Sequence, residues 1–496
     1  MNILNNSGYQ LMKQSKVFLF LCFVLLSLTN INCYRLRGSK GGGQIETIQP
    51  RTINQNDIGL QPGYKIEPVI SGLTFPTAVA FDDENKLYVI EAGYSYDEIF
   101  GEPKLLRIDG DKTTLIAKGT NNGPWTGITW YDGAFYVAEG GEMNGGKILK
   151  ISKDGTITTL ISDLPSMGDH HTNGPVVKDG YIYFGQGVAT NSAVVGTDNA
   201  DFGWLLRKKD FHDIPCADIT LTGQNYTSPN PLTDDPDDET STGAYVAFGT
   251  ATTPGQVIKG VVPCTGSILR IPISGGPAEL ISWGFRNPFG LAFHPDGRLF
   301  ITENGFDTRG SRPVWGAGDA LWEIKTGVWY GFPDYSAGKS IVDDEEFKTP
   351  GKDAVKPLLQ KYPNVPPKPA AIFGVHSSSD GFDFSRSSDF GYVGEAFVAQ
   401  FGDMPPGAGK VLFPVGFKIV RANIETGVIN DFATNKGKRN GPASWLKKGG
   451  LERPVSVKFD KPGSALYVVD FGILKTDEKG SHSQTKTGMI WKITKQ

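Results

Sequence analysis

The chain of 496 residues is long enough for two or three average domains or for one large all-β domain. Lys and Arg total 49 against 53 Asp and Glu, and the resulting formal net charge of −4 argues against a nucleic-acid partner. The 63 glycines, 32 prolines and 11% aromatic residues are typical of short strands joined by many turns, and they argue against a protein of long helices.

Residues 1–33 have the features of an export signal. Lys13 and Lys16 precede an uninterrupted apolar run at 17–28, which is too short to span a membrane comfortably. We therefore expect an exported protein that works in the periplasm or at the cell surface.

Cys33 stands at the end of this signal, before a polar, Gly-rich stretch at 34–62 that we interpret as a tether. Its context resembles the lipid-attachment cysteine of a bacterial lipoprotein, except that Asn30 and Asn32 replace the aliphatic and the small residue of the usual pattern. Two interpretations stay open. Either Cys33 carries a lipid that anchors the protein to a membrane, or the protein is simply secreted.

Two cysteines remain in the mature chain once Cys22 and Cys33 are assigned to the leader. These are Cys216 and Cys264. In an oxidising compartment we expect them to form a disulfide, and the alternative is a pair of buried free thiols.

Six similar apolar segments recur along the chain, and each reads as a strand: KLYVIEAG from Lys86, AFYVAEGG from Ala134, YIYFGQG from Tyr181, RLFITENG from Arg298, AFVAQFG from Ala396 and ALYVVDFG from Ala465. A shorter apolar strand ending in a turn precedes each segment, and a third strand follows it. A single sheet of this kind cannot bury both of its faces, so the sheets must pack against one another around an axis. The sequence therefore predicts an all-β fold, a six-bladed β-propeller over residues 63–496.

Two details of this propeller can also be predicted. The segment YKIEPVISG at 64–72 is expected to close the ring beside the terminal GMIWKITKQ. The interval between the third and fourth core strands is the longest, and it holds a polar insertion at 190–263 that contains both mature cysteines. This insertion either has a function or is a surface loop that the disulfide cross-links.

A polar side chain stands near the end of each core strand: Glu91, Glu139, Gln186, Glu303, Gln400 and Asp470. Such a ring of acids and amides could hold a cation or a polar ligand on one rim. The alternative is that each side chain caps its own turn.

The stretch SWGFRNPFGLAFHPDGRLFITENGFDTRG at 282–310, with WYGFPDYSAG at 329–338, carries a specific resemblance. Arg-Asn-Pro, Glu-Asn-Gly and Tyr-Gly-Phe-Pro in this order resemble the glucose and sorbosone dehydrogenase family, and the sorbosone-dehydrogenase-like branch is the closer match. GFKIVRANIETG and RPVSVKFDKPGSALYVVDFG, further along, resemble that branch too. Members are soluble propeller enzymes that use pyrroloquinoline quinone (PQQ) with calcium.

The resemblance implies a catalytic base in the segment GDHHTNGP, because family members carry a histidine just before the third core strand. His171 takes that place, and the adjacent His170 is the alternative. A neutral imidazole is suited to removing a hydroxyl proton near pH 7. Asp169 is expected to orient the imidazole. The Arg that usually ends the family segment is replaced by Pro175.

The resemblance also implies the cofactor and metal contacts. Arg286 and Asn287 match residues that hold the quinone, and a guanidinium pairs well with carboxylates. Lys418 resembles a lysine near the cofactor, and Arg453 an arginine at the rim, with a solvated surface position as the alternative for both. Gly305 and Phe306 match positions whose main-chain carbonyls bind calcium.

Three other residues complete this comparison. Phe289 stands where glucose dehydrogenases have an amide. His376 could line the site, whereas His294 is expected to belong to a turn.

Three functions are consistent with these residues. The first is a PQQ-dependent dehydrogenase that oxidises an aldose or related sugar aldehyde, an oxidoreductase whose electron acceptor the sequence does not name. The second is a propeller that binds carbohydrate or protein without catalysis, favoured by the changes at Pro175 and Phe289. The third is a calcium-dependent sugar lactonase that uses the ring of acids and needs neither Arg286 nor Lys418. Fold alone does not separate them.

Overall fold

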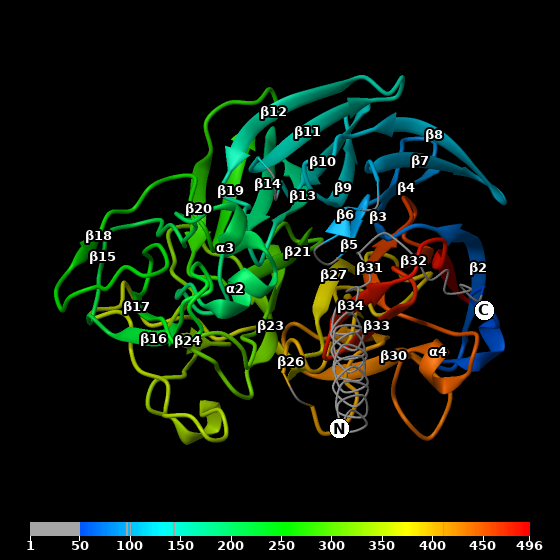
Figure 1. The fold of residues 1–496 in the computed structure, drawn as a ribbon. Helices are drawn as coiled ribbons and strands as arrows, with labels where there is room; N and C mark the ends of the chain where they lie inside the picture. The colour runs from blue at the N-terminus through cyan, green and yellow to red at the C-terminus, as the bar shows by residue number, and fades with distance from the viewer. Residues whose placement is uncertain (1–49, 96–97, 100, 142–143, 410) are drawn as a thin grey trace, which may run out of the picture. The chain divides into compact units, whose positions relative to one another are not determined.

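Short strands separated by tight turns build six antiparallel sheets of four main strands each. The computed structural model describes residues 50–496 except 96–97, 100, 142–143 and 410, and residues 51–496 form one unit. The export signal, Cys33 and the tether up to residue 49 lie outside the described residues. The six sheets are the blades of a β-propeller, which confirms the predicted fold (Figure 1).

The blades follow one another along the chain. Blades 1 and 2 contain β3 (Pro76–Phe81), β4 (Leu87–Glu91), β7 (Lys104–Asp109) and β8 (Lys112–Lys118), then β9 (Trp125–Tyr131), β10 (Ala134–Glu139), β11 (Gly146–Ser152) and β12 (Ile157–Leu164). Blades 3 and 4 contain β13 (Thr172–Lys178), β14 (Tyr181–Gln186), β19 (Ser267–Pro272) and β20 (Glu279–Trp283), then β21 (Asn287–Phe293), β22 (Leu299–Asn304), β23 (Gly318–Glu323) and β26 (Ala371–Val375). Blades 5 and 6 contain β27 (Ser379–Phe384), β28 (Ala396–Gln400), β29 (Lys418–Ala422) and β30 (Ile429–Asn435), then β31 (Pro454–Phe459), β32 (Ala465–Asp470) and β35 (Gly488–Lys495).

The ring is closed by a strand from the beginning of the described chain. β2 (Tyr64–Leu73) pairs antiparallel with β35 and completes blade 6, with Ile66 opposite Ile493. The predicted closure is thereby confirmed. The first strands of neighbouring blades contact one another in a complete cycle of β3, β9, β13, β21, β27 and β31.

One strand precedes the closure. β1 (Ile58–Leu60) pairs with β30 and adds an outer fifth strand to blade 5. It lies within the stretch 34–62 that was expected to be a tether, so ordered structure begins before residue 63.

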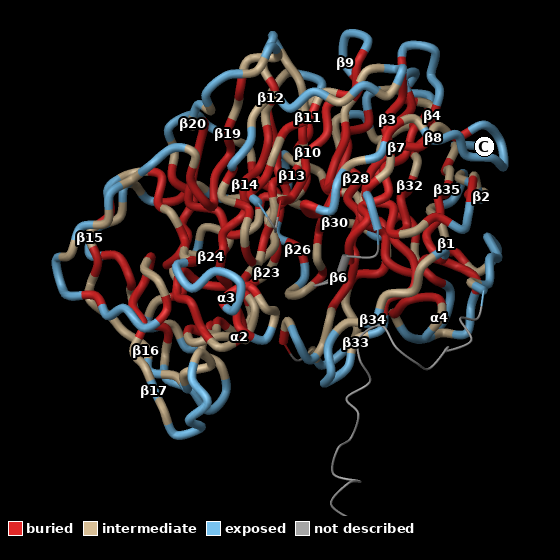
Figure 2. The backbone as a smooth tube through the Cα atoms, turned by 45° about the horizontal axis from the view of Figure 1, so that its top comes forward, coloured by how far each residue is buried: buried red, intermediate tan, exposed pale blue. Residues whose placement is uncertain are grey.

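The second strand of each blade is buried because neighbouring blades cover both of its faces. Phe135 of β10 is 0% exposed, and its ring packs 4.5 Å from the ring of Tyr88 in blade 1 and 4.6 Å from that of Trp130. Figure 2 shows buried segments along the strands and exposed segments at the outer turns. The six predicted core segments occupy these equivalent strands, β4, β10, β14, β22, β28 and β32.

The insertion lies between β14 and β19. It contains α2 (Thr197–Asp201), α3 (Trp204–Arg207), the pair β15 (Ile219–Thr220) and β18 (Val257–Ile258), and the pair β16 (Asn225–Pro229) and β17 (Glu239–Gly243). Cys216 and Cys264 form the predicted disulfide, with Cα atoms 5.1 Å apart. An apolar cluster that includes Val194, Cys264 and Trp329 packs the insertion against the loop after β23. The insertion therefore has a core of its own.

The remaining elements are short and belong to connections: η1 (Gln55–Asp57), β5 (Tyr94–Ser95), β6 (Glu98–Ile99), β24 (Tyr335–Ser336), β25 (Lys339–Ser340), η2 (Glu345–Phe347), α4 (Ala443–Leu446), β33 (Leu474–Asp477) and β34 (Gly480–Ser483). Within the described residues, no helix has the length and apolar character that crossing a membrane requires.

Candidate functional site

A cavity of about 350 Å³ opens at one end of the blades. In an antiparallel four-stranded blade, the connection between the second and third strands and the connection to the next blade emerge at the same end. The polar lining comes from these connections and from the strand ends beside them, with residues drawn from within 169–173, 286–287, 304–309, 376–380, 402–408 and 476–481. Trp204 and Phe202 of the insertion also line the cavity.

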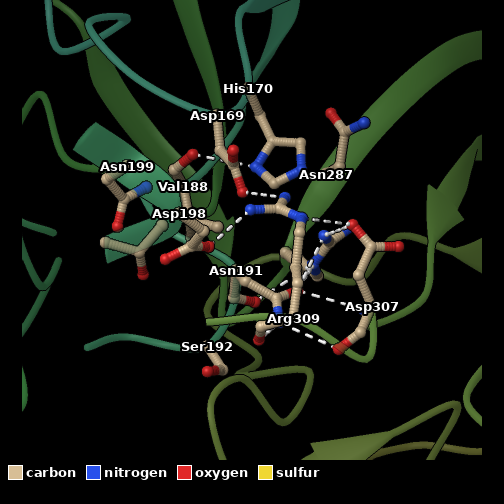
Figure 3. Close-up of polar contacts among 12 residues, drawn as sticks. Asp169, His170, Val188, Asn191, Ser192, Asp198, Asn199, Asn287, Asp307 and Arg309 are labelled. Carbon is tan, nitrogen blue, oxygen red and sulfur yellow. Dashed lines mark hydrogen bonds and ion pairs between the residues drawn. The ribbon is translucent and has the colours of Figure 1, made fainter. Parts of the chain in front are cut away.

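His170 has a defined tautomer. Its Nδ1 lies 2.9 Å from the carbonyl oxygen of Val188, which can only accept, so the neutral ring carries its proton on Nδ1 and keeps Nε2 as an acceptor. No group among the described residues donates to Nε2. Burial lowers the pKa of His170 well below its usual value, and the nearby cations Arg286 and Arg309 lower it further. Figure 3 shows the ring beside the guanidinium of Arg309.

His171 lines the same cavity, with its ring edge-on to that of Tyr94 at 6.2 Å between centroids. Burial lowers the pKa of His171 to about 4. Both imidazoles are therefore neutral near pH 7, as a general base requires, and the hydrogen bond to Val188 gives His170 the better-defined acceptor.

Asp169 pairs with Nη2 of Arg309, whereas the ring of His170 is oriented by the main-chain carbonyl of Val188 (Figure 3). The Asp169 carboxylate also acts on His171, where it opposes the lowering of the pKa by burial. That Asp169 orients the imidazole of His171 stays a prediction.

Arg309 and Arg286 form a network of charges in the cavity wall. Arg309 donates from Nε to Asp307 at 3.1 Å and from Nη1 to Asp198 of α2 at 2.7 Å. Arg286 donates from Nη2 to Asp307 at 2.8 Å and to Oδ1 of Asn191 at 2.8 Å. Burial tends to raise the pKa of Asp307, but the two guanidinium groups outweigh it and the pKa lies below its usual value.

A second polar cluster consists of amides. Asn287 donates from Nδ2 to Oδ1 of Asn304 at 2.7 Å, and Asn173 donates to Oδ1 of Asn287 at 3.3 Å. Asn304 in turn donates to Asp380 at 3.3 Å. Burial raises the pKa of Asp380 well above its usual value, and the carboxylate of Asp319 raises it further. The buried Oδ1 of Asn173 accepts no hydrogen bond from the described residues.

Not every predicted residue reaches the cavity. Arg286, Asn287 and Gly305 line it, together with His376 and Phe289. Phe306 is buried and stacks on Phe332 at 5.7 Å between ring centroids, in the apolar cluster of the insertion.

Lys418 and Arg453 do not line the cavity. The ammonium of Lys418 pairs with Asp431 at 2.7 Å on the outer side of blade 5. Arg453 is 3% exposed, and its Nη1 donates to the main-chain oxygens of Gly402 at 3.2 Å and Asp403 at 3.0 Å. Arg453 therefore supports a loop of the cavity from behind, and neither Lys418 nor Arg453 lines the cavity as the resemblance implied.

The ring of acids and amides at the strand ends does not face the cavity. Glu91 accepts from the main-chain N–H of Thr74 at 2.7 Å, and Glu303 accepts from that of Arg286 at 2.6 Å. Asp470 accepts from the main-chain N–H of Arg453 at 2.9 Å. These three side chains therefore bind the main chain that enters the first strand of their blade, which is a capping role but not at the turn after their own strand. Within the described residues, no three or more His, Cys, Asp or Glu side chains are arranged to hold a metal ion.

The sequence reasoning missed Asp307, Arg309 and Asn191. The first two stand in GFDTRG, inside the stretch that carried the family resemblance, and Asn191 is the second residue of the insertion. The signal available in the sequence was the pair of opposite charges, Asp307 and Arg309, directly after the fourth core strand.

Residues 270–379 match the family described as Glucose / Sorbosone dehydrogenase. The resemblance expected from the motifs is thus confirmed for blade 4 and its surroundings. A stretch of 211 residues is 28% identical to an uncharacterized protein of Borreliella burgdorferi, and it covers 41% of this chain and 50% of the relative. The chain spans about half the length of that curated relative.

Solved structures show the same fold. The holo form of the pyranose dehydrogenase PQQ domain from Coprinopsis cinerea has a TM-score of 0.52 and 14% identity, and covers 90% of this chain and 98% of its own. The calcium structure of the carbohydrate-active enzymes family AA12 protein from Trichoderma reesei has a TM-score of 0.54 and 16% identity. The match covers 90% of this chain and 100% of that structure's chain. At these identities the likeness establishes the fold only.

Proposed function

We propose that the protein is a PQQ-dependent dehydrogenase that oxidises an aldose or related sugar aldehyde. One observation carries the proposal. The segment that matches the family, 270–379, brings Arg286, Asn287 and Asp307 to the same cavity as His170 of the preceding blade. These are the residue types that an anionic cofactor and a hydroxyl proton require.

The donors in the cavity fit one carboxylate of the quinone. Nε and Nη2 of Arg286 are bonded to Asn191 and Asp307, but no described group accepts from Nη1. Arg286 would hold a cofactor carboxylate through this nitrogen, and Asn287 and Asn173 would hold polar atoms beside it. When bound, PQQ supplies the hydride acceptor of the reaction.

Calcium would have to use main-chain oxygens as well as side chains, because the described side chains alone form no metal centre. Gly305 lines the cavity, and its N–H donates to Asp319 at 2.9 Å. We propose the carbonyl of Gly305 as a calcium ligand, since calcium takes oxygen ligands of this kind. The carbonyl of Phe306 remains a prediction of the resemblance.

His170 is the proposed base. Its Nε2 accepts the proton of the substrate hydroxyl while the C–H hydrogen leaves as hydride, and the O–H electron pair forms the new carbonyl. Val188 keeps the acceptor nitrogen pointing away from the main chain by holding Nδ1. Three carboxylates pair with Arg309 and raise the pKa of its guanidinium, so Arg309 stays protonated and cannot act as the base. His171 remains the alternative base.

A propeller that binds a sugar without oxidising it is the second candidate. Two observations favour it: Lys418 lies away from the cavity, and the carboxylates of Asp169, Asp198 and Asp307 already neutralise the two guanidinium groups. The lactonase hypothesis is no longer supported, because it required the acids at the strand ends to face a ligand and they bind main-chain N–H groups of the blades instead.

We also propose that the protein is exported, periplasmic or at the cell surface, and that Cys33 carries a lipid anchor. The disulfide between Cys216 and Cys264 supports an oxidising compartment.

The proposed function predicts dye reduction by the purified chain in the presence of PQQ, calcium and a suitable aldose. His170→Ala is expected to lower kcat by about a hundred- to ten-thousand-fold, because the hydroxyl proton loses its acceptor. His294→Ala is the matched control, since His294 lies in an outer turn beside Asp296. Quinone that binds but supports no turnover with any aldose would favour the binding protein. A loss of rate with His171→Ala and not with His170→Ala would show that His171 is the base.

A further inference from the structure

A cationic segment lies on the surface of this acidic protein. Residues 436–448, which connect β30 to blade 6 and include α4, contain five cations and no Asp or Glu: Lys436, Lys438, Arg439, Lys447 and Lys448, all exposed. Lys436 donates to the main-chain oxygen of Asn56, and Lys448 lies 3.7 Å from Asp57. No carboxylate of the described chain is within ion-pair distance of the other three cations. Their charge is directed to solvent.

Large apolar side chains are exposed next to these cations. Trp445 of α4 is 54% exposed, and Leu412 and Phe413 in the loop before β29 are 90% and 79% exposed. Asn440 joins the two segments, because its Nδ2 donates to the main-chain oxygens of Pro414 at 2.9 Å and Gly416 at 3.0 Å. We call Lys438, Arg439, Lys447, Lys448, Trp445, Leu412 and Phe413 together the basic-apolar surface.

The start of the folded unit lies against the same surface. The N–H of Asn54 donates to the carbonyl of Gly449 at 2.7 Å, and Arg51 donates to the carbonyl of Gly450 at 2.8 Å. In Figure 1 α4 follows β30 in the orange part of the chain. Seventeen residues, 34–50, separate Cys33 from Arg51, and an extended chain of that length reaches about 60 Å at most. A chain anchored at Cys33 would enter the folded unit beside the basic-apolar surface.

We propose that the basic-apolar surface binds an anionic membrane surface and orients the propeller on it. Cations next to exposed Trp and aliphatic side chains are the features by which proteins lie on anionic bilayers: the cations attract the headgroups and the apolar side chains enter the interface. A nucleic acid or an acidic protein would use the cations but would leave Leu412 and Phe413 in water. The position of Arg51 also favours the membrane, because a lipid anchor at Cys33 would bring this surface close to the bilayer.

The surface and the cavity share a loop. Gly407 and Ala408, which line the cavity, lie a few residues before Leu412 in the connection between β28 and β29. Membrane contact at Leu412 and Phe413 therefore places this side of the cavity next to the bilayer. The inference does not depend on which reaction the cavity performs.

Vesicle binding tests the proposal with the full chain carrying Cys33→Ala, so that no lipid can be attached. We expect tighter binding at low salt to vesicles with one third phosphatidylglycerol than to pure phosphatidylcholine, to which only the apolar parts of the chain contribute. Lys438→Glu, Arg439→Glu and Lys447→Glu together should weaken binding to the anionic vesicles by about 100-fold or more, since each cation near the surface contributes about a fivefold factor. The apolar leader is identical in all variants, so it cannot produce this difference.

The matched control reverses three exposed lysines elsewhere, Lys325, Lys352 and Lys361, and changes the net charge by the same amount. This variant should bind like the parent. Trp445 fluorescence gives a second readout: brominated lipids should quench the parent more than Trp445→Phe. Equal binding of the two charge-reversed variants would overturn the proposal. Binding to duplex DNA as tight as to anionic vesicles, without quenching by brominated lipids, would overturn it in favour of a nucleic-acid surface.

Discussion

The imidazole of His170 illustrates how a main-chain carbonyl sets a side chain's chemistry. Val188 O accepts from Nδ1, which leaves Nε2 as the acceptor in the cavity. Val188 lies in the first residues after β14, where the chain turns into the insertion, and its own N–H donates to the carbonyl of Arg286 at 2.9 Å. The proposed base His170 and the proposed cofactor contact Arg286 are therefore connected through one residue of the main chain.

The pH dependence of the reaction follows from the burial of these rings. Burial favours the neutral imidazole, so the pKa of His171 falls to about 4 and that of His170 also lies well below the usual 6.5. As the pH falls, the base stays unprotonated until the lowered pKa is reached. We expect kcat/KM to stay flat as the pH falls from about 8 through the usual histidine pKa of about 6.5, measured by stopped-flow dye reduction. An acidic limb at about pH 6.5 would show an ordinary, solvated histidine.

For single residues, the sequence predicted correctly which ones reach the cavity where a motif fixes their position in a blade. Arg286 and Asn287 lie at the start of β21, so a correct strand assignment brought them to the cavity. Lys418 starts β29, where a long side chain can turn toward either neighbouring strand, and it turns to Asp431 of β30. Motif spacing carries no information about that choice.

Among the elements, the insertion contributes most to the cavity wall beyond the blades. It supplies Asn191 to Arg286 and Asp198 to Arg309, and Phe202 lies 5.1 Å from the guanidinium of Arg309. Its length and its cysteines were visible in the sequence. Its contacts were not, because segments without a repeating apolar pattern give no register against the rest of the fold.

Removal of the disulfide tests this role. Cys216→Ser with Cys264→Ser frees a loop with a sequence separation of 48 residues, and the chain-entropy estimate gives a loss of about 4 kcal/mol. We expect faster hydrogen exchange in α2, α3 and β15–β18 with little change in the blades, and weaker quinone binding because Asn191 and Asp198 lose their positions.

The control for this experiment is Cys22→Ser, which changes a leader cysteine and should leave exchange unchanged. Exchange in the insertion that is equally slow in the double variant would show that its apolar core holds it without the bond.

For the whole molecule, closure of the ring is the property that builds the site. The cavity residues come from connections at one end of the blades, from nearby strand positions and from the insertion. They meet around one cavity because β2 pairs with β35 and completes the cycle. Repeats in the sequence predicted the blades and their order, since buried second strands require apolar residues. The centre of the ring has no such pattern, and Asp307, Arg309 and Asp380 became apparent only in three dimensions.

The central claim is that residues from two neighbouring blades form one quinone site around Arg286. An absorbance titration of PQQ into the folded full chain with calcium tests it most directly, with Arg286→Gln beside the control Arg298→Gln, whose guanidinium lies on an outer turn with Asp296. We predict micromolar or tighter binding by the parent and by Arg298→Gln, and a loss of about 100-fold for Arg286→Gln, which corresponds to a hydrogen bond from a charged group to a carboxylate. Equal binding by all three proteins, or no binding by a folded parent, would contradict the claim.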